Sequence, residues 1–295
     1  MTLAAVARSL RAAGVDVRYD EPLSDHTTFR VGGPADGYCE PQSIPELVEA
    51  VRLCRAQAFP LFVLGAGSNI LFPDDGHRGV VICTKSIRGV AASSTGLDVA
   101  AGEPLSSALA AAEEWGSRSL GFLAGIPGTV GGAVATNAGI PGRAMSDVIE
   151  SVSIIDPANQ SAELAPRECG FGYRTSRIRD RRLVVVSAKL RFDHEIYDPA
   201  VLLARRRTTQ PIGQASAGCV FRNPPGGSAG ALIDQAGLKG FTVGRAQVSE
   251  KHANFIVNLG GATSAEICKL IDIVRQKVYK TYQVSLDLEV EVVAG

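Results

Sequence analysis

Hydrophobic residues recur every three or four positions in several segments of the chain, which is the spacing of one face of a helix. The clearest case is residues 265–282, where Thr263 and Glu266 also form the capping-box pattern that begins a helix. Four further helices are predicted. They lie at residues 1–14, 45–59, 104–116 and 199–207.

Short apolar runs between turn residues predict strands. They lie at residues 61–64, 80–83, 97–101, 148–155 and 183–192. Residues 286–292 alternate strictly between apolar and acidic side chains, which predicts a half-buried strand with Asp287, Glu289 and Glu291 on one face. Helices and strands are mixed along the chain, so we expect an α+β protein, with a boundary near residues 194–199.

Glycine is the unusual component of the composition, with 32 residues in 295, against a usual share of about 7%. Residues 119–142 carry no charge and are long enough to span a bilayer. They are rich in glycine and contain two prolines, and irregular backbone inside a membrane is tolerated only where protein buries it. We therefore expect a buried system of glycine-rich loops and no membrane insertion.

The charges exclude several classes of partner. Thirty basic residues balance 30 acidic ones, so the chain has no general electrostatic footprint for nucleic acid or an anionic membrane.

The six cysteines are scattered without close pairs, which argues against both a disulfide framework and a metal site. The first residues lack the pattern of a signal peptide, so we expect a cytoplasmic protein.

Two glycine-rich turns are candidates for holding phosphate. Residues 65–69 (GAGSN) follow a predicted strand, and successive main-chain N–H groups in such a turn can bind an anion. The dinucleotide fingerprint G-x-G-x-x-G fails because its last position is Ile70, and a Rossmann dehydrogenase is therefore disfavoured. One such turn alone is typical of an ordinary strand connection. A second turn at residues 125–139 favours a large phosphate-bearing cofactor lying against the backbone.

Three motifs in order along the chain resemble those of the UDP-N-acetylenolpyruvoylglucosamine reductase family. They are residues 26–36 (HTTFRVGGPAD), 64–69 (LGAGSN) and 125–139 (GIPGTVGGAVATNAG). The resemblance implies a vanillyl-alcohol-oxidase-like FAD-binding fold with two FAD-binding subdomains, residues 1–85 and 86–197. A C-terminal α+β substrate domain over residues 198–295 completes it.

The resemblance also implies how FAD is held. Some members of the wider fold attach FAD through a histidine in the first glycine turn, where this chain has Ser68 and Asn69, so we expect non-covalent FAD. The residues expected to contact the cofactor are Gly65, Ala66, Gly67, Ser68, Asn69, Gly125, Pro127, Gly128, Thr129, Gly131, Gly132, Asn137, Ala138 and Gly139.

The family motifs also select three catalytic residues. Residues 172–177 (GYRTSR) match the Y-R-x-S motif, which implies that Arg174 binds a carboxylate and stabilises enolate charge. Residues 216–224 (SAGCVFRNP) place Cys219 where many relatives have a proton-donating serine. A thiol has a reference pKa of about 8.5 and must stay protonated to act as the donor. Periodicity does not choose among the carboxylates of residues 286–292, but the family's closing L-x-x-E-V motif selects Glu289.

The same resemblance assigns substrate contacts to Tyr173, Asn223, Lys239 and His252. Taken alone, a single histidine is more often structural. Many relatives carry a tyrosine where this chain has Pro141, and the lack of an insertion after residue 222 resembles the shorter subtype without a tyrosine-bearing substrate loop. We expect no metal.

The implied reaction belongs to peptidoglycan precursor synthesis. NADPH passes hydride to FAD N5 and leaves, and UDP-N-acetylglucosamine enolpyruvate then receives hydride at C3 and a proton at C2. We expect a monomer. An oxygen-using FAD oxidase of the same fold and a flavin-binding or nucleotide-binding protein without turnover are the alternatives. The second is disfavoured, because pure binding does not need Arg174, Cys219 and Glu289 together.

Overall fold

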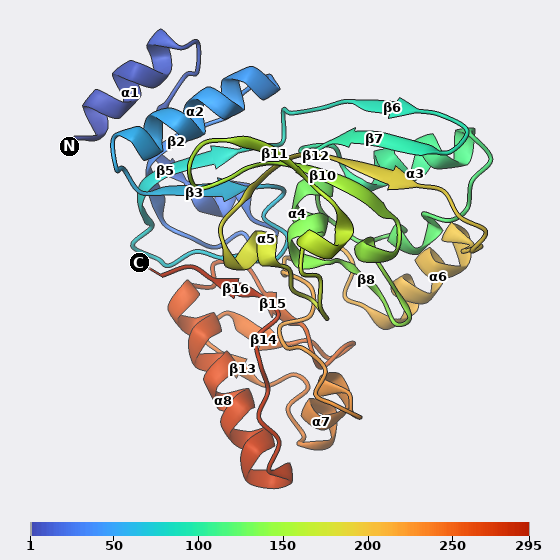
Figure 1. The fold of residues 1–295 in the computed structure, drawn as a ribbon. Coiled ribbons are helices and arrows are strands. Elements are labelled where there is room, and N and C mark those ends of the chain that lie inside the picture. Colours follow the sequence, from blue (N-terminus) through green and yellow to red (C-terminus); the bar gives the residue numbers. More distant parts are fainter. Residues whose placement is uncertain (1, 295) are drawn as a thin grey trace. The chain divides into compact units, whose positions relative to one another are not determined.

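The computed structural model describes residues 2–294, which fold into two compact units (Figure 1). Unit 1 contains the residues up to 19, residues 37–66 and residues 79–204. Unit 2 contains residues 20–36, residues 67–78 and the chain from residue 205 onward. Each unit is built from separated segments of the sequence.

The first core of unit 1 lies beneath two helices, α1 (Leu3–Ala12) and α2 (Ile44–Ala56). Ser43 accepts the Glu46 N–H at the start of α2, which is the capping interaction expected at a helix N-terminus. The nearby sheet has the strand order β1-β2-β5-β3. Its strands are β1 (Arg18–Pro22), β2 (Pro34–Cys39), β3 (Leu61–Leu64) and β5 (His77–Cys83), with β3 parallel to β5.

The second core of unit 1 is formed by an antiparallel sheet in the order β11-β10-β12-β7-β6. Its strands are β6 (Val90–Ala92), β7 (Gly96–Ala100), β10 (Ile149–Ile155), β11 (Ser161–Leu164) and β12 (Val184–Arg191). The associated helices are α3 (Leu105–Glu114), α4 (Val130–Thr136) and α5 (Arg177–Asp180). A small hairpin, β8 (Gly139–Ile140) and β9 (Arg143–Ala144), follows α4.

Unit 2 packs α8 (Ser264–Tyr282) beside a small antiparallel sheet, as the red and orange segments of Figure 1 show. The sheet contains β13 (Thr242–Val243), β14 (Ala246–Val248) and β15 (Ile256–Asn258). Helix α7 (Ala229–Gln235) precedes it, and β4 (Ile70–Leu71) pairs in parallel with β16 (Glu291–Val292). Helix α6 (Pro199–Thr209) spans the boundary between the units along the chain.

Most predicted elements are present within one to three residues of their predicted ends, and α8 begins with the predicted Thr263 and Glu266 capping box. The strand predicted over residues 286–292 is wrong for most of its length, because only Glu291–Val292 is a strand. The N–H groups of Glu289 and Val290 both donate to the Val220 carbonyl, at 2.8 and 3.3 Å, and this bends the chain. The three carboxylates therefore do not share one strand face.

The prediction that residues 119–142 form only loops is also corrected, since α4 lies within them. Among residues 2–294, two hydrophobic clusters lie in unit 1 and one lies in unit 2. The predicted domain ranges 1–85, 86–197 and 198–295 stay a prediction.

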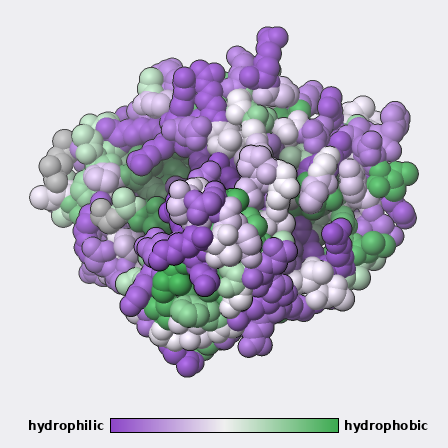
Figure 2. Space-filling view, turned by 90° about the horizontal axis from the view of Figure 1, so that it is seen from below, coloured by the Kyte–Doolittle hydropathy of each residue, from purple (hydrophilic) through white to green (hydrophobic). Residues whose placement is uncertain are grey.

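The face shown in Figure 2 is mostly hydrophilic, with hydrophobic residues in separated groups. Within residues 2–294, no helix is both long and apolar enough to cross a bilayer.

Candidate functional site

The first glycine turn is fixed by the motif at residues 26–29. Gly67 is buried and has a φ of +63°, a conformation that side-chain-bearing residues rarely adopt. A Cβ at this position would lie 2.1 Å from the His26 carbonyl oxygen. The Gly67 carbonyl in turn accepts the Thr28 N–H at 3.1 Å. A side chain at position 67 would collide with the backbone of residues 26–27, so this position requires glycine.

The second glycine-rich segment lies against the start of the first turn. A Cβ on Gly65 would lie 2.6 Å from Thr129 Oγ1. Thr129 is the N-cap of α4, and its hydroxyl accepts the Gly132 N–H at 3.4 Å. Within unit 1 the structure therefore brings together two segments that the sequence predicted to contact the same cofactor.

Both turns present main-chain donors suited to an anion. Over residues 2–294, the N–H groups of Ala66, Gly67, Asn69, Gly128 and Thr129 donate no hydrogen bond. Gly67 and Thr129 are buried, and buried main-chain donors are nearly always paired in folded proteins. Phosphate oxygens are acceptors that satisfy such N–H groups. Within unit 1, the N–H groups of Ala66, Gly128 and Thr129 therefore suit a phosphate group such as those of FAD.

The start of α4 offers fewer donors than its glycines suggest. The Val130 and Gly131 N–H groups donate to the carbonyls of Glu103 and Ala101, at 2.9 and 2.8 Å. A Cβ on Gly131 would lie 3.0 Å from the Ala101 Cβ, whereas one on the exposed Gly132 would meet only Thr129 Oγ1, at 3.6 Å. The structure thus gives Gly131 a packing role and leaves open space beside Gly132. Of the other predicted contacts, Gly125 and Pro127 are exposed, whereas Ser68 and Ala138 are half-buried.

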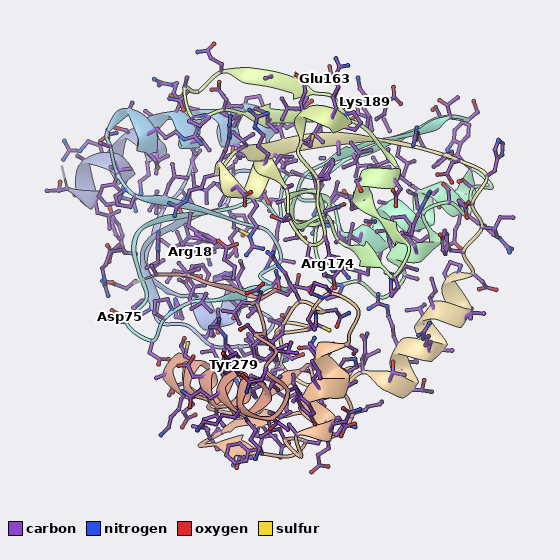
Figure 3. The ribbon with its side chains drawn as sticks, turned by 60° about the horizontal axis from the view of Figure 1, so that its bottom comes forward. Arg18, Asp75, Glu163, Arg174, Lys189 and Tyr279 are labelled. Carbon is purple, nitrogen blue, oxygen red and sulfur yellow. The ribbon has the colours of Figure 1, made fainter. Side chains whose placement is uncertain are left out.

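Arg174, labelled in Figure 3, lies in a tight turn of unit 1 just before α5. Its φ is +56°, and its Nη2 donates to the Gly139 carbonyl at 2.6 Å. The guanidinium carbon lies 5.8 Å from the centre of the Tyr173 ring, and Tyr173 itself is exposed. The second glycine segment and the predicted catalytic arginine are therefore in direct contact through Gly139.

Cys219 and Glu289 lie on neighbouring segments of unit 2. Cys219 pairs with Phe255, and the next residue, Val220, accepts the Glu289 N–H at 2.8 Å. The Asn69 side chain donates to the Glu289 carbonyl at 3.0 Å. Unit 2 therefore brings together part of the first glycine turn and two of the predicted catalytic residues. Both side chains are half-buried.

Comparison with known proteins shows which family shares these features. Residues 210–293 match the model of the UDP-N-acetylenolpyruvoylglucosamine reductase C-terminal domain, and residues 35–162 match an FAD binding domain. The UDP-N-acetylenolpyruvoylglucosamine reductase of Synechococcus sp. is 45% identical over 282 residues, covering 93% of this chain and 90% of the relative. The chain belongs to the UDP-N-acetylenolpyruvoylglucosamine reductase family.

Further relatives extend this similarity to nearly the whole chain and to the fold. The reductase of Moorella thermoacetica is 42% identical and covers 99% of this chain and 98% of its own length. The crystal structure of the Thermus caldophilus reductase matches with a TM-score of 0.77 at 36% identity, covering 94% of this chain and 98% of that one. The predictions of an FAD-dependent oxidoreductase and of a vanillyl-alcohol-oxidase-like FAD-binding fold are confirmed.

The predicted substrate residues have protein contacts of their own in this family member. Lys239 Nζ lies 2.6 Å from the Asp234 carboxylate, and both side chains reach solvent. The Asn223 side chain accepts the Ala229 N–H at 3.0 Å and so helps to fix the start of α7. Both residues are exposed, and their substrate contacts stay predictions.

His252 is held beside Phe255 and is expected to influence stability at mildly acidic pH. Its Nδ1 accepts the Asn254 N–H at 3.3 Å, so the neutral ring carries its proton on Nε2. Burial, assisted by the Lys239 charge, lowers the pKa of His252 below the ordinary value of 6.5. The unfolded chain then binds more protons than the folded one between the two pKa values.

We therefore expect His252 to lower the free energy of unfolding as the pH falls from about 6.5 towards the pKa of His252 in the folded chain. Replacement by glutamine (H252Q) removes this contribution. Thermal unfolding of the native chain and of H252Q should be compared across this interval. A native chain that loses no more stability than H252Q on acidification would contradict the assignment.

Asn254, within the segment KHANFIVN, holds the backbone of Phe221 through its side chain. It is 3% exposed, and its amide forms two hydrogen bonds with the Phe221 backbone. Oδ1 accepts the Phe221 N–H at 3.0 Å, and Nδ2 donates to the Phe221 carbonyl at 2.8 Å. The pairing fixes the segment that carries Cys219. The signal in the sequence was an amide side chain within an otherwise apolar run.

Replacing Asn254 by alanine (N254A) leaves two buried main-chain groups unpaired, and we expect a loss of about 2–4 kcal/mol of stability. Asn254→Asp keeps the acceptor but buries a carboxylate against the Phe221 carbonyl oxygen, so at neutral pH its midpoint should lie at or below that of N254A. Acidification should raise its midpoint relative to that of N254A, because a protonated carboxyl regains a donor. Thermal unfolding tests the order. Equal midpoints for all three proteins would show that the amide does not hold Phe221.

No group of three or more His, Cys, Asp or Glu side chains is arranged to hold a metal ion within the described part of the chain.

Proposed function

We propose that the chain reduces UDP-N-acetylglucosamine enolpyruvate to UDP-N-acetylmuramate in peptidoglycan precursor synthesis, with NADPH as the reductant and non-covalent FAD as the cofactor. FAD, when bound, would supply hydride chemistry, taking hydride from NADPH at N5 and giving it to C3 of the enolpyruvyl group. Family membership over nearly the whole chain supports the reductase activity.

The observation that carries the proposal is the conformation of Arg174. A positive φ is uncommon for an arginine, and such strain persists where the surroundings enforce it and often where function needs the side chain. A fixed guanidinium binds a carboxylate in a bidentate manner and stabilises charge that develops next to it. We assign this role to Arg174 during hydride addition to the substrate.

The other two roles follow from the chemistry of the side chains. Cys219 donates a proton to C2, which completes the lactyl ether. Glu289 assists the stabilisation of the charge at C2 and the adjoining carboxylate. Tyr173, Asn223, Lys239 and His252 bind the substrate in this proposal, and NADPH occupies the same site before it. A monomeric state, a cytoplasmic location and the three domain ranges remain part of the proposal.

Anaerobic absorbance of the FAD-loaded protein tests the proposal. NADPH should bleach the flavin, and subsequent addition of UDP-N-acetylglucosamine enolpyruvate should restore its absorbance. Bleaching without recovery would refute the substrate and keep the flavoprotein. Rapid recovery on admitting air, with indifference to the sugar nucleotide, would instead identify an oxidase. Failure to bind FAD would refute the cofactor assignment.

A further inference from the structure

Arg174 lies in a four-residue β-turn, residues 172–175, whose first and last residues are joined by two hydrogen bonds. The Gly172 N–H donates to the Thr175 carbonyl at 3.0 Å, and the Thr175 N–H donates back to the Gly172 carbonyl at 3.3 Å. Arg174 is the third residue of this turn, a position with positive φ that normally favours glycine or asparagine. An arginine there carries a conformational cost, so contacts outside the turn must hold it in place.

Three hydrogen bonds tie this turn and the residue after it to the C-terminal end of α4 and to Gly139 of β8. Asn137 Nδ2 donates to the Gly172 carbonyl at 2.9 Å, and Ser176 Oγ donates to the Ala135 carbonyl at 2.6 Å. The third is the bond from Arg174 to the Gly139 carbonyl. All of these residues belong to unit 1. The last carbonyls of a helix lack partners within the helix, and here Ser176 supplies a donor to one of them.

Asn137 links the turn to the rest of the unit. It is 5% exposed and caps α4 with a left-handed φ of +46°. Its Oδ1 accepts the Ser146 N–H at 2.9 Å while its Nδ2 holds Gly172. Glycine would adopt the same backbone conformation more easily. The helix end itself does not require an asparagine side chain. The Asn137 amide adds a hydrogen-bond donor and an acceptor on opposite sides of one rigid group.

We propose that Asn137 is a positioning residue that holds Arg174 by bridging the Gly172 carbonyl and the Ser146 N–H, in place of the cofactor contact expected from its motif. This inference rests on the proposed function for the reaction that Arg174 serves. The bridge itself is a property of unit 1 alone. Ser176, which is fully buried and also caps α5, anchors the other side of the turn.

Two variants separate the bridge from the helix end. Asn137→Gly keeps the left-handed conformation and loses both hydrogen bonds, whereas Asn137→Asp keeps the acceptor for Ser146 and loses the donor to Gly172. Thr136→Ala is the matched control, because it removes a side-chain hydrogen bond to the Gly132 carbonyl on the same helix without touching the turn.

We expect both Asn137 variants to retain FAD and to be reduced by NADPH within about twofold of the native rate. Reoxidation by UDP-N-acetylglucosamine enolpyruvate should slow by about 10- to 100-fold, because a small misplacement of a catalytic group has effects of this order. The activity of N137D relative to the native chain should rise on acidification, since a protonated carboxyl regains a donor for Gly172. Thr136→Ala should behave as the native chain does.

Limited digestion with trypsin tests the bridge without any reaction. Cleavage after Arg174 should be faster in both Asn137 variants than in Thr136→Ala, as measured by mass spectrometry of the peptides. Unchanged cleavage together with unchanged reoxidation would overturn the inference. Loss of FAD from the Asn137 variants, or equal slowing of their reduction and reoxidation, would indicate that Asn137 contacts the cofactor. Failure of the native chain to be reoxidised would refute the proposed function, while the digestion result would still decide the bridge.

Discussion

Replacing Cys219 by alanine (C219A) is expected to leave flavin reduction by NADPH nearly intact and to slow reoxidation by the enolpyruvyl substrate by about 10²- to 10⁴-fold. That range is the usual contribution of a positioned general acid. The backbone around Cys219 is held on both sides, since Val220 N–H donates to the Asn254 carbonyl at 2.8 Å and Cys219 pairs with Phe255. Loss of the thiol should therefore remove a proton donor without moving the segment.

Stopped-flow absorbance of the two half-reactions measures this effect. Cys268→Ala is the matched control, because Cys268 is another half-buried thiol of unit 2 and lies on α8. It should leave both half-reactions unchanged. Cys219→Ser should retain much more of the second half-reaction than C219A does. Equal loss of both half-reactions in C219A would contradict a role in proton donation.

Replacing Gly67 by alanine (G67A) should produce the largest structural effect. The new Cβ would lie 2.1 Å from the His26 carbonyl oxygen and 2.9 Å from the Thr27 Cα. Both are backbone atoms, so no rotamer change relieves the contact. Together with the strain of a positive φ, we expect a loss of about 3–5 kcal/mol and a fall in Tm of roughly 10 °C. The FAD content should fall as well, because the turn carries N–H donors suited to phosphate.

Gly116→Ala provides the comparison that isolates the clash. Gly116 also has a positive φ, of +75°, but a Cβ there would meet no atom within 4 Å. It should show only the conformational strain, about 1–2 kcal/mol, with unchanged FAD content. Thermal unfolding and FAD per chain should be measured for both variants. Similar values for the two would show that the packing of residues 26–27 on Gly67 is unimportant.

Two of the predicted catalytic residues contact a glycine-rich segment within their own unit. In unit 1, Arg174 contacts Gly139 of the second glycine segment, and in unit 2 the Glu289 carbonyl accepts a hydrogen bond from Asn69 of the first turn. Arg174 and Glu289 are therefore each anchored to a segment predicted to hold the cofactor. Such anchoring fixes catalytic groups relative to a bound ligand, which preorganised sites require.

Local sequence patterns predicted helices α1, α2, α3, α6 and α8, the strands β3, β5, β7, β10 and β12, and the family motifs. They missed the short helices α4, α5 and α7 and most of the remaining strands. Residues 265–282 form a helix because periodic apolar positions and a capping box are local signals, which do not depend on distant contacts. The glycine turns and Arg174 were likewise recognisable from short motifs.

Features that depend on contacts between residues far apart in the chain could be found only in the folded structure. The bend at Glu289 and Val290 arises because both N–H groups meet the Val220 carbonyl, although the alternating pattern favoured a strand. The roles of Asn137 and Asn254 depend on backbone partners 35 and 33 residues away. Hydrogen bonds between distant segments leave no periodic pattern in the sequence, so local reasoning found the residues but not what they hold.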